Sequence, residues 1–186
     1  MAGARDTALR ALIAMRRQGA WSDGALKEYI AQDRLERRDA ALASQLCYGV
    51  LQNKLLLEFY LAQVLTGKLK DVQPIVADIL RLGAYQILFL DRVPDSAAVN
   101  EAVEQCKRFA ERRASGLVNG VLRALSRQKA ALRQPDDLQT RYSHPAALIA
   151  LPEAASTARS VASPPSGFPP VMSHGTPPGG IPDVPT

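Results

Sequence analysis

Few side chains in this sequence could carry out covalent chemistry or hold a metal ion. The chain has two cysteines, Cys47 and Cys106, which lie 59 positions apart, and only two histidines. Zinc sites and disulfide scaffolds need clustered ligands or several cysteine pairs, so this spacing argues against both. Both cysteines fall on apolar helix faces and are expected in the core. Ser143 and His144 place a hydroxyl beside an imidazole, but neighbours in sequence rarely reach triad geometry. The sequence therefore predicts no catalytic and no metal-binding residue.

Basic side chains give the stronger chemical signal. The chain carries 23 Lys and Arg against 18 Asp and Glu, and residues 107–133 hold eight bases and one acid. Clustered guanidinium groups suit contacts with RNA phosphates, although any single arginine can equally be a solvated surface charge. The RNA-binding candidates come from this stretch and from the first helix, and they are Arg5, Arg10, Arg16, Arg17, Arg108, Arg112, Arg123 and Arg127.

Helical spacing ranks these candidates. Arg10 and Arg17 share one flank of the first predicted helix, and Arg123 and Arg127 lie opposite the apolar stripe of the last one. We predict that these four contact phosphates, that the two basic regions join into one positive surface, and that removing the four side chains spares the fold. The competing hypothesis places RNA on Arg108 with Arg112.

The elements that must position these side chains are helices. Apolar spacing predicts an all-α fold, a bundle of about seven helices with short connections, and no alternating strand pattern competes in residues 1–134. Residues 74–90 start with a proline and are apolar on every side in their second half, so they are expected to form the central buried helix. After Pro94, the next helix is expected to start at Asp95 or Ser96.

Two further local predictions concern helix ends and packing. Ser22 is expected to cap the helix that follows it. The last predicted helix carries an apolar stripe through Leu125 and is expected to fray near Ser126. Gly116 and Gly120, four residues apart on that helix, predict close packing against a neighbour.

Proline marks the domain boundary. Ten of the 13 prolines fall from Pro145 onward. Residues 4–134 are predicted as the helical RNA-binding domain, residues 135–150 as a linker, and residues 151–186 as a Pro/Ser/Gly-rich disordered tail. No apolar run is long enough for a secretory signal or a membrane span, so a soluble cytoplasmic protein is expected.

Four segments carry a resemblance to a known family. They read RRDAALASQLCYGVL (37–51), ILRLGAYQILFLDRVP (79–94), AAVNEAV (97–103) and LVNGVLR (117–123). Together they resemble, in order, the NusB-like RNA-binding domain over residues 4–128. Their sequences most resemble the N-terminal domain of the bacterial ribosomal RNA cytosine-C5 methyltransferase RsmB (Sun). RYSHP (141–145) resembles the segment that leads into the catalytic half of that enzyme.

The resemblance implies an RNA-binding domain that positions a ribosomal RNA methyltransferase on its RNA. It also implies S-adenosylmethionine as the cofactor of the parent family, but this chain contains neither its glycine-rich loop nor its Pro-Cys and Thr-Cys catalytic motifs. We therefore expect no cofactor bound by this chain. The expected partners are RNA, ribosomal in origin, and a small-subunit ribosomal protein, with no membrane and no readout of DNA. The alternatives are a stand-alone antitermination factor that binds RNA with a ribosomal protein, and a protein–protein interaction module.

Overall fold

Helix follows helix along the part of the chain that the structure describes. In this computed structural model that part comprises residues 3–18 and 23–143. Its α-helices are α1 Ala4–Gln18, α2 Asp23–Gln32, α3 Arg37–Gln52, α4 Lys54–Val64, α5 Pro74–Phe89, α6 Asp95–Phe109, α7 Ser115–Gln128 and α8 Leu138–Tyr142, and its 3-10 turns are Leu69–Asp71, Arg112–Ala114 and Lys129–Ala131. These residues contain no strand, and the predicted all-α fold is confirmed with eight α-helices where about seven were expected.

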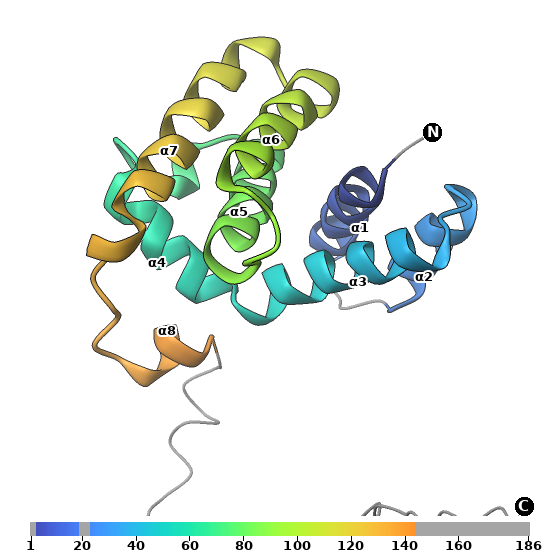
Figure 1. The fold of residues 1–186 in the computed structure, drawn as a ribbon, viewed down its shortest axis with the longest axis horizontal. Coiled ribbons are helices and arrows are strands. Elements are labelled where there is room, and N and C mark those ends of the chain that lie inside the picture. The colour runs from blue at the N-terminus through green and yellow to red at the C-terminus, as the bar shows by residue number, and fades with distance from the viewer. Residues whose placement is uncertain (1–2, 19–22, 144–186) are drawn as a thin grey trace, which may run out of the picture. The chain divides into compact units, whose positions relative to one another are not determined.

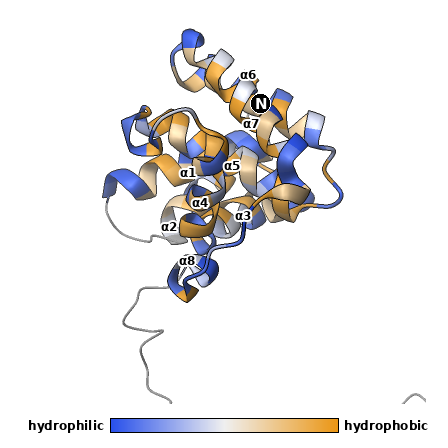
Figure 2. Cartoon of the chain, turned by 90° about the vertical axis from the view of Figure 1, so that its left-hand side faces the viewer, coloured by the Kyte–Doolittle hydropathy of each residue, from blue (hydrophilic) through white to orange (hydrophobic). Residues whose placement is uncertain are grey.

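The central helix is α5. Pro74 lies in its first turn, where a missing N–H costs no hydrogen bond, and its side chains between Val76 and Ile87 are almost all buried. It packs on α1, α3, α4, α6 and α7. Figure 1 shows it with α4 and α7 on one side and α1 on the other. In Figure 2 the surrounding helices carry an orange apolar side and a blue hydrophilic side, as packing around one buried helix requires.

Two glycines set how closely α5 approaches its neighbours. A Cβ added to Gly83 would meet a methyl carbon of Leu122 in α7 at 2.5 Å. A Cβ added to Gly49 of α3 would overlap the ring of Tyr85. Overpacked positions of this kind force neighbouring side chains or backbone to move. Both glycines are therefore required by the close approach of two helices.

The α6–α7 pair confirms one prediction and corrects two. α6 begins at Asp95, directly after Pro94, as expected. α7 does not fray at Ser126 but continues to Gln128 and then into a 3-10 turn, because Ser126 donates a hydrogen bond of 2.7 Å to the Asp95 carboxylate. The predicted close packing at Gly116 and Gly120 is also wrong: both glycines are exposed, and an added Cβ would meet nothing within 4 Å.

A segment that we call the strap, residues 132–143, lies over α4. It comprises the last residues of the predicted domain and the first part of the predicted linker. The side-chain amide of Gln63 both donates to the Arg133 carbonyl (3.0 Å) and accepts from the Arg133 N–H (2.9 Å). The Tyr60 hydroxyl donates to the Gln134 side chain at 2.6 Å, and α8 packs on α4. Side chains of α4 therefore hold the strap in place along its length.

The chain divides into two units, residues 1–150 and residues 151–186, and all of the described residues belong to the first. The predicted tail, the end of the predicted linker and the predicted capping residue Ser22 lie outside the described residues. None of the described helices is both long enough and apolar enough to cross a membrane.

Candidate nucleic-acid interface

Of the two arginines that spacing placed on the outer flank of α1, Arg10 is engaged by neighbouring residues. A nitrogen of Arg10 lies 2.7 Å from the carboxylate of Asp33, and its guanidinium stacks over the ring of Tyr29, 4.5 Å from the ring centre. Thr7, one turn earlier, donates to the same Asp33 carboxylate at 2.6 Å. These contacts join α1 to the end of α2, so Arg10 has a structural role that helical spacing did not reveal.

A second ionic cluster joins α1 to α5 and α4. Arg16 donates to the Asp78 carboxylate at 2.8 Å, and Asp78 also pairs with Arg81 at 2.8 Å. Arg81 in turn contacts Glu58 of α4 at 2.8 Å. Asp78 is buried, and a buried charge is tolerated only when it is paired. Arg16 therefore balances a buried carboxylate.

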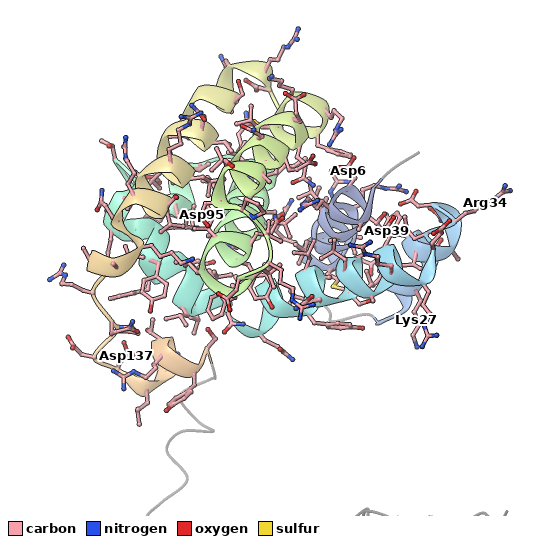
Figure 3. The ribbon with its side chains drawn as sticks, in the orientation of Figure 1. Asp6, Lys27, Arg34, Asp39, Asp95 and Asp137 are labelled. Carbon is pink, nitrogen blue, oxygen red and sulfur yellow. The ribbon has the colours of Figure 1, made fainter. Side chains whose placement is uncertain are left out.

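The remaining candidates near α1 differ from one another. Arg5 donates from Nε to the buried amide of Gln86 at 2.6 Å. Arg108 of α6 pairs with Asp6 at 2.9 Å, and the Gln105 amide donates to the same carboxylate at 3.2 Å. Asp6 is labelled in Figure 3. Arg17 is exposed and makes no ion pair with any described residue.

Part of the basic stretch that begins in the last turn of α6 is neutralised locally. Lys107 lies 2.6 Å from Glu104, and the hydrogen bond from this ammonium is the main reason why the pKa of Glu104 is lowered. Arg113 pairs with Glu111, whose pKa is lowered first by a hydrogen bond from Gln73 and then by Arg113. Arg112 is exposed and pairs with no acid in the described part of the chain.

The outer side of α7 is different, because its arginines lack acidic partners. Helical spacing puts four exposed residues in a narrow arc opposite the buried Val118, Val121, Leu122 and Leu125, and these four residues, which we call the α7 face, are Gly116, Gly120, Arg123 and Arg127. Arg123 donates from Nε to the Asn119 side chain at 2.8 Å. Neither arginine pairs with an acid among the described residues. This face combines bare helix backbone with uncompensated positive charge.

A depression of about 310 Å³ lies beside the α7 face, between α6 and α7. Its lining residues include Asp95, Ser96, Asn100, Arg123 and Arg127. Asp95, labelled in Figure 3, accepts the hydrogen bond from Ser126 and lies 4.0 Å from the Lys129 ammonium. Its negative charge is therefore directed to side chains other than the two arginines of the α7 face.

The two basic helices lie on different sides of the domain. α1 packs on α2, α3 and α5, whereas α7 packs on α4, α5 and α6. Figure 1 shows α5 and α6 between them. Arg10 and Arg17 therefore do not lie beside Arg123 and Arg127, and the four residues do not form one continuous patch.

A second concave surface is not indicated by helical spacing. This α3–α5 cleft, about 820 Å³ in volume, is lined by Arg5, Arg38, Asp39, Phe89, Asp91 and Arg92 among others. Phe89 is 40% exposed although it ends an apolar helix, and its ring stacks on that of Tyr85 with 5.3 Å between centres. The clue in the sequence was an aromatic residue at the end of the central helix, three positions before an arginine.

The cysteines are buried and Ser143 is already bonded. Both cysteines are free and buried, and burial raises the pKa of Cys47 to about 12 and also raises that of Cys106, which keeps both thiols protonated. Ser143 accepts a hydrogen bond from the Leu56 N–H, and His144 lies outside the described residues. No group of described residues could hold a metal ion. Nor do residues 3–18 and 23–143 include a glycine-rich loop that would fit S-adenosylmethionine.

Similarity to known proteins shows the family of the chain. A model of the NusB family matches residues 2–127, which is more than half of the chain. The chain belongs to the NusB family. The resemblance found in the four sequence segments is confirmed.

Relatives within the family are of two kinds. The chain is 38% identical over 150 residues to the probable ribosomal RNA small subunit methyltransferase B of Bacillus subtilis (strain 168), covering 78% of this chain and 33% of that protein. It is 34% identical over 119 residues to the transcription antitermination protein NusB of Xanthomonas axonopodis pv. citri (strain 306), covering 64% of this chain and 75% of that one. The chain thus spans about a third of the length of the Bacillus methyltransferase.

A solved structure supports the fold. The chain matches one chain in a crystal structure of antitermination factors NusB and NusE in complex with dsRNA, with a TM-score of 0.62 and 23% identity, covering 67% of this chain and 94% of that one. At this identity the match shows the NusB fold alone.

Proposed function

We propose that this NusB-family domain binds RNA through the α7 face and positions a ribosomal RNA methyltransferase on its RNA. The observation that carries the proposal is the contrast in charge pairing. Arg123 and Arg127 lie on one exposed face with no acidic partner among the described residues, whereas Arg10 and Arg16 are held by carboxylates. Uncompensated guanidinium groups on one side of a helix suit contacts with successive phosphates.

The methyltransferase assignment is supported by the strap. An alignment that covers 78% of this chain cannot end at residue 127, so the match to the Bacillus methyltransferase continues past the end of the NusB family match. A segment that is shared beyond the RNA-binding domain and held on α4 by specific hydrogen bonds fits a domain that leads into a further part of a longer enzyme. S-adenosylmethionine would be bound by that further part, and we propose no role for it in this chain.

The second candidate function is a stand-alone antitermination factor that binds RNA together with a ribosomal protein. It is favoured by one observation: the chain covers 75% of the Xanthomonas NusB protein, against 33% of the Bacillus methyltransferase. A pull-down of purified small-subunit ribosomal proteins, with and without RNA, distinguishes the two functions. Retention of one such protein that depends on RNA would favour the second candidate, and its absence favours the first.

RNA binding itself is tested with Arg123→Gln/Arg127→Gln and a small-subunit ribosomal RNA transcript. Each arginine that neutralises a phosphate of a single strand should contribute about 0.7 to the slope of log affinity against log salt concentration. We expect the double variant to lower that slope by about 1.4, with similar losses for all RNA sequences. The pair Arg108→Gln/Arg112→Gln is the matched control. If the control pair lowers the slope and the α7 pair does not, RNA lies on the other surface.

A further inference from the structure

The α3–α5 cleft has a composition that phosphate binding alone does not explain. Among its lining residues, Arg5, Arg38 and Arg92 are balanced by an equal number of acids, Glu36, Asp39 and Asp91. A surface that only follows a phosphate backbone would carry net positive charge. The cleft therefore suits a ligand that presents both anionic groups and hydrogen-bond donors.

Five of these charged groups have no partner among the described residues. Arg38 and Arg92 make no hydrogen bond or ion pair through their side chains with any described residue, and the same is true of Glu36, Asp39 and Asp91. By contrast, Arg5 is held by its hydrogen bond to Gln86. Five charged groups that line one cleft without partners among the described residues are available to a ligand.

The lining of the cleft includes the ring of Phe89, which belongs to a flat aromatic pair. The ring of Phe89 stacks on that of Tyr85, with an interplanar angle of 18° and with one side of the pair buried. Tyr85 is in turn placed by Gly49, because any larger residue there would overlap its ring. Phe89 is thus a supported ring with an exposed part, and an unpaired base is the usual occupant of such a surface in proteins that bind single-stranded RNA.

The position of the cleft connects it to the α7 face. Val93 lines the α3–α5 cleft and Asp95 lines the depression beside Arg123 and Arg127, so only Pro94 separates the two along the chain. Figure 3 labels one residue of each, Asp39 on α3 and Asp95 at the start of α6. A single strand that leaves the α7 face at the α5–α6 turn would reach the cleft directly.

We propose that the α3–α5 cleft binds one unpaired RNA base, stacked on Phe89. In this arrangement Arg38 and Arg92 contact the flanking phosphates, and Asp39 and Asp91 accept hydrogen bonds from an exocyclic amino group of the base. The cleft therefore selects an amino-bearing base such as cytosine over uracil. This inference rests on the proposed function, since it adds a base-reading subsite to the RNA surface.

The test measures fluorescence anisotropy with labelled 12-nucleotide oligocytidine, oligouridine and an RNA duplex of equal length. Phe89→Ala should weaken binding of oligocytidine by about tenfold, because stacking on an aromatic side chain contributes at this level, and should leave duplex binding unchanged. Phe89→Leu keeps an apolar contact with Tyr85 and should lose affinity similarly, whereas Phe89→Trp should retain it. Asp39→Asn/Asp91→Asn should narrow the preference for oligocytidine over oligouridine.

Tyr142→Ala is the matched control, because Tyr142 is an aromatic residue that is 60% exposed and lies outside the cleft. It should bind all three RNAs as the unchanged protein does. The inference is overturned if Phe89→Ala and Phe89→Leu bind oligocytidine with normal affinity while Arg123→Gln/Arg127→Gln binds it more weakly. The cleft would then be a surface for a protein partner. An equal loss for duplex and single strand overturns it as well. Failure of the unchanged protein to bind any RNA would refute the proposed function itself.

Discussion

α1 and α7 both carry arginines, yet the two helices use them differently. On α1, Arg10 and Arg16 pair with Asp33 and Asp78, which belong to other parts of the fold. On α7, Arg123 and Arg127 pair with no acid among the described residues. Positive charge on a helix therefore becomes a candidate for RNA binding only after the acids of neighbouring elements have been located.

The largest effect expected from this comparison comes from removing the acid at the centre of the α1 side. Asp78→Ala leaves Arg16 without its carboxylate and deprives the half-buried Arg81 of one of two partners. We expect a loss of about 3 kcal/mol in the free energy of unfolding, because breaking a buried pair leaves an uncompensated charge. Thermal denaturation should show a melting temperature lower by about 10 °C. The exposed Asp71→Ala is the control, and an equal shift in that variant would contradict the pairing argument.

The next effect separates two arginines on the same flank of α1. Arg10→Ala removes a charged hydrogen bond to Asp33 and the stacking on Tyr29, and Arg10 is only 29% exposed. A loss of about 1.5–2 kcal/mol is expected, at the lower end of the range for hydrogen bonds to charged groups. Arg17→Ala should change stability by less than about 0.5 kcal/mol. Chemical denaturation of both variants measures this difference, and equal stabilities would show that the Arg10 contacts contribute nothing.

A smaller effect, with the opposite sign, is expected on α7. Gly120→Ala should stabilise the fold by about 0.5–1 kcal/mol, since Gly120 is exposed inside a helix and its replacement meets nothing within 4 Å. Gly49→Ala, where the new Cβ would overlap the Tyr85 ring, is the opposing control and should destabilise by about 1–3 kcal/mol. A destabilised Gly120→Ala variant would mean that this side of α7 is covered.

The smallest stability effect should come from the residues proposed to contact RNA. Arg123→Gln/Arg127→Gln should unfold within about 0.5 kcal/mol of the unchanged protein, because neither side chain balances a buried charge. Thermal and chemical denaturation are both suitable measurements. A loss near that of Asp78→Ala would remove the distinction between the two helices.

The sequence was sufficient for the fold because local signals agreed with one another. Pro74 and Pro94 marked helix starts, and the apolar second half of α5 predicted its central position. The site was harder, because its partners are distant in the chain. Arg10 and Asp33 are 23 positions apart, Arg16 and Asp78 are 62 apart, and helical period alone contains no information about either pair.

The same limit applied to glycines and aromatics. A spacing of four residues at Gly116 and Gly120 marks one side of a helix, but only the packing of α6 and α7 decides that this side faces solvent. Likewise Phe89 continues an apolar run, and its exposure depends on where α3 lies. The candidates on α7 could therefore be predicted, whereas the α3–α5 cleft could not.

The strap gives the domain a mechanical property. Side chains of α4 hold Arg133 and Gln134, and the Leu56 N–H holds Ser143. The backbone therefore leaves α8 from a point that is held against α4. α4 also packs on α7, so the same rigid body carries that point and the α7 face. In a longer relative built this way, an attached domain would begin at a set distance and direction from the bound RNA.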